Sequence, residues 1–262
     1  MESEIRDGYI FADCGTGHMR MCIFASDLQK SVSYIIEHHI ASIAIDLVDP
    51  VAIHESCRLN DSSILFNARK TESVDIDLSC MRDCREIVEL SLEGNILHGE
   101  VLESIPTLHT LYVHNEYGKE KLHLKNLSAL RELWITKYKQ NIVGLSELNQ
   151  LQKMYIWNYM SKSRNLSELS GLRSLQYLEL IQPRIDSLDG IEQLPMLEQL
   201  KVYYARALSD ISAIGKSPSL AKASFDHIPK IQKGDLPKME GFDVASGHGQ
   251  FGYTRIALPD GQ

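Results

Sequence analysis

Apolar residues recur through two thirds of the chain in the pattern L-x-x-L-x-L, in which other apolar residues can replace Leu. Seven copies begin at Ile87, Leu108, Leu130, Leu151, Leu175, Leu197 and Leu220, with steps of 21, 22, 21, 24, 22 and 23 residues. Alternation of apolar and polar positions within a copy predicts a short strand with one buried face. An even step over many copies is typical of repeat architectures.

Between these strands the apolar residues fall at every third position, as in Leu124, Leu127 and Leu130 or Leu169, Leu172 and Leu175. A period of three is neither that of a strand nor that of an α-helix, and it suits a short 3₁₀ turn. Each repeat is therefore predicted to be a strand, a turn and a tight apolar return segment.

These residues resemble those of leucine-rich repeat proteins of the short, about 22-residue class, such as the internalins and the phosphatase-1 regulatory subunit. The resemblance covers about residues 85–228. It implies an α/β solenoid with a concave parallel β-sheet and a 3₁₀ or irregular convex side. The family usually carries Asn eight residues after the first Leu, where its amide bonds neighbouring turns. Here only Asn95 matches, and the other copies hold Glu116, Tyr138, Tyr159, Pro183, Ala205 and Ile228. An irregular solenoid, whose turns are held by other means, is expected.

The ends of a solenoid need caps because they expose its apolar core. We expect a capping unit over residues 1–84, the seven repeats over 85–228, and a C-terminal cap over 229–262. In the last part, Met239, Phe242 and Val244 resemble an eighth strand, and a turn then leads to a final strand at YTRIAL.

The first 84 residues contain several predicted elements. YIFAD and MRMCIFA are expected to form a hairpin, and Ser26 is expected to cap a helix over residues 27–40. IASIAID, ILFNA and SVDIDLS are expected to be strands. Ile43 and Ile45 precede Ile64 and Phe66 by 21 residues, which leaves open whether degenerate repeats begin here.

Three outward positions in each repeat strand are predicted to line the concave face. Six of these 21 positions are Tyr or Trp, whereas the composition of the chain would give about one or two. Since Tyr and Trp dominate protein interfaces, we predict a partner-binding surface rather than rings that merely cover the sheet or bind a small molecule or glycan. Tyr112, Trp134 and Tyr155 should form a contiguous stripe that Trp157 and Tyr177 widen. Tyr138 and Tyr159 should lie at its edge if the turns curl inward. The predicted partner-binding residues are Tyr112, His114, Trp134, Tyr155, Trp157, Tyr177, Glu179, Lys201 and Tyr203.

Composition and charge narrow the classes of partner. The chain is 24% charged, with a formal net charge of −8, which argues against nucleic acid or an anionic membrane as the main partner. No apolar run approaches the length of a membrane span, and the first residues lack the features of a signal peptide. Five cysteines without framework spacing suggest reduced thiols and a cytoplasmic protein.

Two motifs suggest other chemistry. Asp13-x-Gly15-x-Gly17 resembles the phosphate-binding hairpin of actin-like and sugar kinases and the first motif of methyltransferases, but a predicted strand follows it and the second kinase motif is absent. A turn is the simpler interpretation. His54 and Cys57 with Cys80 and Cys84 match no zinc-finger spacing. We expect no cofactor and no metal.

The sequence thus favours a non-enzymatic protein-interaction module, acting as a monomer or in a heterocomplex. A bacterial immunity or inhibitor protein that masks a toxin or enzyme is the finer hypothesis. The alternative is a nucleotide- or AdoMet-dependent module that uses the DCGTG turn.

Overall fold

The structure is a computed structural model, and it describes residues 2–13, 17–46, 48–59, 74–114, 120–136, 138, 142–231, 236, 238, 240–247 and 250–256. The chain divides into two compact units, unit 1 over Met1–His123 and unit 2 over Leu124–Gln262. This division falls among the repeats, and the division at residues 84 and 228 into caps and repeats stays a prediction. Each unit is described by itself.

Unit 1 is built on six strands in the spatial order β1-β2-β3-β4-β6-β8. Their bounds are β1 Ser3–Arg6, β2 Tyr9–Ala12, β3 Arg20–Phe24, β4 Ser42–Asp46, β6 Glu89–Glu93 and β8 Thr110–His114. The first three strands are antiparallel, and β3, β4, β6 and β8 run parallel. The parallel sheet thus includes the strand of Ile43 and Ile45, ahead of the first full repeat. Ile64, Phe66 and the predicted strand ILFNA lie outside the described residues.

The other elements of unit 1 are short. Two α-helices, α1 Leu28–Glu37 and α2 Pro50–Leu59, accompany β5 Asp75–Asp77, β7 Asn95–Leu97 and β9 Leu122–His123, and the 3₁₀ turns are η1 Ala25–Asp27, η2 Leu78–Met81 and η3 Gly99–Ser104. The predicted hairpin is confirmed by the antiparallel pair β2 and β3. The predicted cap is wrong: Ser26 lies inside η1, and Asp27 precedes the first residue of α1.

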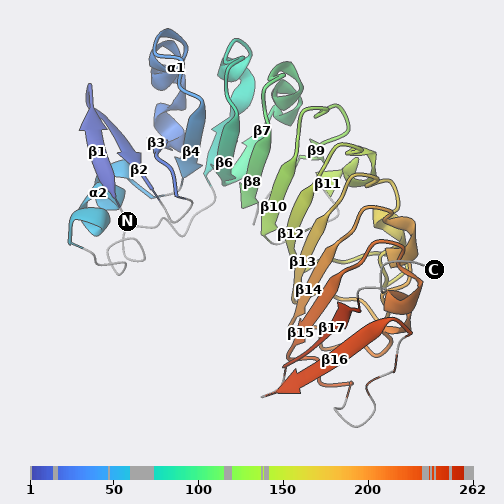
Figure 1. Cartoon of the computed structure of the whole chain (residues 1–262). Helices are drawn as coiled ribbons and strands as arrows, with labels where there is room; N and C mark the ends of the chain where they lie inside the picture. Colours follow the sequence, from blue (N-terminus) through green and yellow to red (C-terminus); the bar gives the residue numbers. More distant parts are fainter. Residues whose placement is uncertain are drawn as a thin grey trace. The chain divides into compact units, whose positions relative to one another are not determined.

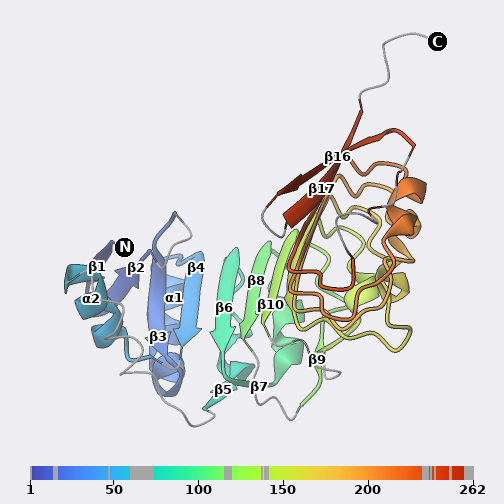
Figure 2. The ribbon, with the colours of Figure 1, turned by 90° about the horizontal axis from the view of Figure 1, so that it is seen from below.

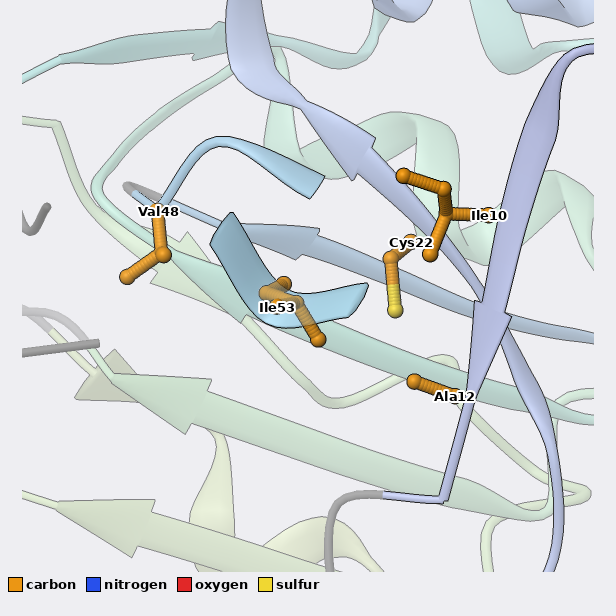
Figure 3. Close-up of a cluster of buried hydrophobic side chains, with 5 residues drawn as sticks. All are labelled: Ile10, Ala12, Cys22, Val48 and Ile53. Atoms are coloured by element: carbon orange, nitrogen blue, oxygen red, sulfur yellow. The ribbon is translucent and has the colours of Figure 1, made fainter. Parts of the chain in front are cut away.

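Helix α2 packs against β2 and β3, and the sequence did not predict it. Ile53 and Val48 contact Ile10, Ala12 and Cys22 in a buried apolar cluster (Figure 3). Ile10 pairs with Cys22, and Cys22 pairs with Ala44. The side chains of this row point to the opposite face of the sheet from those of Met21 and Ile43. Helix α2 therefore closes the outward side of the sheet at its first strands (Figure 1).

Unit 2 carries five of the seven predicted repeat strands. They are β10 Glu132–Thr136, β12 Lys153–Trp157, β13 Tyr177–Ile181, β14 Gln199–Tyr203 and β15 Lys222–Asp226, followed by β16 Phe242–Gly247 and β17 Gln250–Arg255. Strand β11 Ile142–Val143 and the 3₁₀ turns η4 Leu145–Glu147, η5 Ser167–Leu169, η6 Ile191–Gln193 and η7 Ser212–Lys216 complete the unit. Strands β10 to β15 pair in parallel and in order.

The core of unit 2 consists of the inward repeat residues. Leu133, Met154, Leu178, Leu200 and Ala223 form one fully buried register row. The period of three is confirmed as 3₁₀ turns, which lie along one side of the strands in Figures 1 and 2. The outward residues of β10 to β15 are left on the other side, half-buried or exposed.

The repeat turns use the backbone where the family uses Asn. Asn158, Gln182, Tyr204 and His227, each the first residue after its strand, have left-handed φ of 58°, 53°, 56° and 56°. The Asn158 N–H donates to the Ile181 carbonyl at 2.8 Å, and the next two follow the same pattern. At the Asn position itself, Tyr159, Pro183, Ala205 and Ile228 are buried. Apolar side chains thus fill the turns, and backbone hydrogen bonds link each turn to the next strand.

Asn95, the one matching Asn, lies in unit 1. Its side chain is buried, and Nδ2 donates to Asp75 Oδ1 at 2.6 Å. The N–H of Asn95 donates to the Val74 carbonyl at 2.9 Å. Asn95 therefore joins β7 to the neighbouring β5, the kind of bond that the resemblance implied.

The end of unit 2 corrects the predicted eighth repeat. Strand β16, with Phe242 and Val244, pairs antiparallel with β17, and β17 pairs antiparallel with β15. Phe242 is buried, but Val244 is exposed. The predicted last strand is present as β17, shifted to Gln250–Arg255, and Met239 lies outside the described residues. The unit closes with a hairpin rather than with another repeat.

Candidate functional site

The outward residues of β10 to β15 form the largest group of predicted site residues in one unit, and we call this surface the open face. The strand register arranges them in rows. The first row holds Glu132, Lys153, Tyr177, Gln199 and Lys222. The second holds Trp134, Tyr155, Glu179, Lys201 and Ser224, and the third holds Trp157, Ile181, Tyr203 and Asp226.

Three aromatic rings pack together on the open face. Trp134 and Tyr155 stack with ring centroids 3.5 Å apart and an interplanar angle of 8°. Tyr177 packs against Tyr155 at 5.0 Å and 40°. Parallel strands lie about 4.8 Å apart, which brings rings on neighbouring strands into contact. These three residues form a cluster in which Tyr155 is stacked on Trp134 and tilted against Tyr177.

Two carboxylates hold the polar atoms of this cluster. The Trp134 indole N–H donates to Glu132 Oε1 at 2.7 Å, and Lys153 lies 3.7 Å from the other Glu132 oxygen. The Tyr177 hydroxyl donates to Glu179, and Lys201 lies 3.8 Å from Glu179. Burial, and then the hydrogen bond to Glu179, raise the pKa of Tyr177 well above its ordinary value. Tyr177 is therefore a neutral donor.

Trp157, in the third row, is more exposed than the three rings of the cluster. Trp157 is 45% exposed, and among the described residues its indole ring has no hydrogen bond and no ring contact. Ile181 and Tyr203 lie beside it in register and are half-buried. An apolar strip with an exposed tryptophan thus runs along the strand ends.

Tyr112 and His114 belong to unit 1, on β8. The Arg20 guanidinium carbon lies 4.3 Å from the centre of the Tyr112 ring, and buried Arg20 also pairs with the buried carboxylate of Glu89. Ser42 and His18 bind the same carboxylate. His114 is half-buried next to Glu93, on the strand register.

The predicted stripe is therefore only partly recovered. The structure brings Trp134, Tyr155 and Tyr177 together, while contiguity with Tyr112 stays a prediction. The expectation for Tyr159 is wrong, because this residue is fully buried. Tyr138 packs against Tyr159 at 5.6 Å. These two rings fill the turn where the family has Asn.

The Asp13-x-Gly15-x-Gly17 motif, which resembles those of kinases and methyltransferases, lies between two strands of the sheet. The Asp13 carboxylate accepts a hydrogen bond from the Gly17 N–H at 3.0 Å, in the link between β2 and β3. Gly15 lies outside the described residues. A methyltransferase loop would open a helix, whereas strand β3 follows this turn.

The four candidate zinc ligands are divided between α2, which carries His54 and Cys57, and the region of η2, which carries Cys80 and is followed by Cys84. His54 Nδ1 contacts Ser3 Oγ at 2.9 Å. Burial raises the pKa of the Cys84 thiol to about 11. No group of three or more metal-ligating side chains occurs within the described ranges.

Two features near the predicted site residues were not predicted from the sequence. Buried Arg20 pairs with buried Glu89 in unit 1 and lies against the half-buried Tyr112 ring. A strand pattern does not show which charges meet across strands. Tyr204, just past β14, is 46% exposed. Its position in the repeat, one residue beyond the outward set, was the available signal.

Comparisons with known proteins give one informative likeness. No protein-family profile matches the sequence, and no curated protein is significantly similar to it. The crystal structure of internalin C2 from Listeria monocytogenes strain 4b F2365 superposes with a TM-score of 0.50 at 21% identity, over 66% of this chain and 75% of that one. Internalin InlF of the same strain gives a TM-score of 0.44 at 19% identity, over 77% of this chain and 59% of that one.

The helices in the described part of the chain are too short or too polar to cross a membrane.

Three observations indicate the same architecture. They are the parallel strands, the 3₁₀ return turns and the likeness to internalin C2. The chain has the leucine-rich repeat fold of the short-repeat class.

Proposed function

We propose that the chain is a non-enzymatic binding protein that recognises a partner protein through the open face. The observation that carries this proposal is the third row, where Trp157 is 45% exposed beside Ile181 and Tyr203. An exposed apolar strip on a rigid sheet is a typical protein-binding feature. Tryptophan and tyrosine are the residues most often found to dominate the energetics of such contacts.

The aromatic cluster supports partner binding as an ordered platform, whereas the sequence suggested that its rings contact the partner directly. Trp134 has its N–H bound by Glu132 and one ring face covered by Tyr155. Binding a partner would cost little side-chain entropy at such ordered residues. We assign Trp157 and Tyr203 as anchors. The cluster of Trp134, Tyr155 and Tyr177 acts as a fixed platform beside them.

The charged residues of the open face would orient the partner. Glu132 with Lys153 and Glu179 with Lys201 form exposed or half-exposed ion pairs, and such pairs contribute less to affinity than to specificity and association rate. Tyr112 and His114, on β8 of unit 1, are proposed as further partner-binding residues. A partner with an apolar loop and both signs of charge would match the open face.

The finer part of the proposal concerns the biological role. A net charge of −8 and an odd number of cysteines are compatible with a cytoplasmic inhibitor or immunity protein that masks a toxin or enzyme. The genes next to the one that encodes this chain provide a direct check, since an immunity protein is expected beside a toxin.

The binding proposal predicts a selective effect of the Trp157→Ala substitution. Removing an exposed anchor should weaken capture of the native partner by roughly tenfold or more, with the unfolding midpoint almost unchanged because the side chain is exposed. Capture from a lysate of the source organism, quantified with the immobilised chain, gives the first measurement. Titration with the isolated partner gives the second.

Lys216→Ala provides the control, since Lys216 is exposed on η7 of the same unit and lies outside the three rows of the open face. It should bind the partner within about threefold of the unmodified chain. Equal binding by the Trp157→Ala variant and the unmodified chain would overturn the assignment of the open face.

A further inference from the structure

A pocket of about 610 Å³ lies where the last parallel strands of unit 2 end. Ile228, Ile231 and Phe251 give it apolar walls, while Tyr204, His227 and Arg206 are among its other lining residues. Its volume is in the range of small-molecule sites, which are mostly apolar with a few placed polar groups. The site lies outside the three rows of the open face.

Two stacked rings line this pocket. Tyr204 and His227 have ring centroids 4.7 Å apart at an interplanar angle of 26°. His227 is held by Asp226, whose carboxylate lies 2.7 Å from Nδ1, and the Gln250 amide donates to the same carboxylate at 3.2 Å. Tyr204 itself is 46% exposed. The rings thus form an ordered, accessible aromatic surface.

Tyr204 has a backbone conformation that does not favour its side chain. Tyr204 and His227 have φ of 56°, at the repeat position that holds Asn158 and Gln182 in the two turns before Tyr204 and Gly94 in unit 1. Left-handed backbone suits Gly and Asn and is tolerated by His, but it is an outlier for a bulky residue such as Tyr. The fold alone would favour Gly or Asn at residue 204. The Tyr204 side chain is therefore the feature that this position supplies.

Arg206 adds a positive charge to the pocket. Its side chain is exposed, and in the described part of the chain no ion pair involves it. A guanidinium can bind a carboxylate, sulfonate or phosphate in a bidentate way. An aromatic surface, apolar walls and one cation thus line the same pocket.

We propose that this pocket binds a small planar aromatic molecule with one anionic group. The ring system packs against Tyr204 and His227, its body contacts Ile228, Ile231 and Phe251, and the anion pairs with Arg206. The proposal goes beyond the protein-binding role, because it uses a different surface and a different class of ligand.

The test uses 1-anilinonaphthalene-8-sulfonate as the anionic probe and N-phenyl-1-naphthylamine as its neutral counterpart, each titrated into the full chain by fluorescence. Tyr204→Gly should weaken binding of the anionic probe by about tenfold or more. It should not lower the unfolding midpoint, since glycine accepts the left-handed backbone. Tyr204→Phe keeps the ring and should bind almost normally.

Gln182→Gly is the matched control, because it makes the same backbone change at the equivalent position two strands before β15. It should leave probe binding unchanged. Arg206→Gln should weaken binding of the sulfonate by about fivefold or more and leave the neutral probe unaffected.

Two outcomes would overturn the proposal. One is unchanged binding of the sulfonate in the Tyr204→Gly variant. The other is loss of binding in the Trp157→Ala variant, which would place the probe on the open face. The Trp157→Ala result also separates this proposal from the protein-binding one, since that variant is expected to lose partner capture but retain the probe.

Discussion

At the scale of single residues, Gly171 marks a close approach of two neighbouring coils in unit 2. A Cβ at this position would lie 1.8 Å from the Ser146 carbonyl oxygen. Neither atom belongs to a flexible side chain, so the backbone itself would have to move. Glycine is required here for space.

Gly171→Ala is therefore expected to lower the free energy of unfolding by about 3 kcal/mol. Urea denaturation followed by tryptophan fluorescence measures this change in the unit that contains the site. The neighbouring Ser170→Ala change serves as a control, with an expected effect below about 0.5 kcal/mol. A Gly171→Ala variant as stable as the parent would mean that the coils are spaced more widely than described.

The two tryptophans show which properties of a single residue could be predicted from the sequence. Alternation in the repeats assigned Trp134 and Trp157 to the outward set, and both are on the open face. The pattern did not show that Glu132 binds Trp134 or that Trp157 is the more exposed ring. Those properties depend on neighbours across the sheet, which strand periodicity does not specify.

At the scale of elements, the repeat strands were the most predictable part of the molecule. All seven occupy the expected residues, from Glu89–Glu93 to Lys222–Asp226. Every copy repeats the same alternation, and each inward residue needs the same dry environment. The consistent pattern over many copies made the register clear.

Elements outside the repeats were less predictable, for identifiable reasons. Helix α2 buries only Ile53 and Ser56 fully, so its apolar periodicity is weak. The strand pattern of Phe242 and Val244 is the same for parallel and antiparallel pairing. The pairing direction of β16 is instead set by β17, Gln250–Arg255, which lies between β16 and β15 and pairs antiparallel with both.

The terminal hairpin is expected to matter for stability. Tyr253 is fully buried, and its ring meets Phe225 and Phe251 edge-on at 6.4 and 6.3 Å. Arg255 donates to the carbonyls of Leu220 and Ser217, each at 2.7 Å. The hairpin therefore covers the end of the repeat core and is tied to it.

Tyr253→Ala should consequently destabilise the chain by about 3 to 4 kcal/mol, as large-to-small changes of buried aromatic residues do. Thermal unfolding monitored by fluorescence provides the measurement. Val244→Ala, at an exposed position of the same hairpin, should change stability by less than about 1 kcal/mol. Equal effects of the two substitutions would contradict the role of the hairpin as a cap.

At the scale of the whole molecule, each unit has its own core and its own order of strands. Repeat proteins gain stability from contacts between neighbouring repeats, and terminal elements have a neighbour on one side only. Local stability should therefore vary along each unit.

Amide hydrogen exchange is expected to report this gradient. Within unit 1, amides of β3 and β4 should exchange at least about tenfold more slowly than those of β1, whose side chains are mostly exposed. Within unit 2, amides of β13 should be the slow ones and those of β16 the fast ones. Uniform protection in either unit would show that it opens as a single block.

The distribution of helices and tryptophans gives the two units different spectroscopic signals. Both tryptophans, Trp134 and Trp157, belong to unit 2, whereas both α-helices of the described residues belong to unit 1. Selectively excited tryptophan emission therefore reports on unit 2, and the α-helical part of the far-ultraviolet circular dichroism reports on unit 1. The natural chain carries a separate optical probe for each half, without any label.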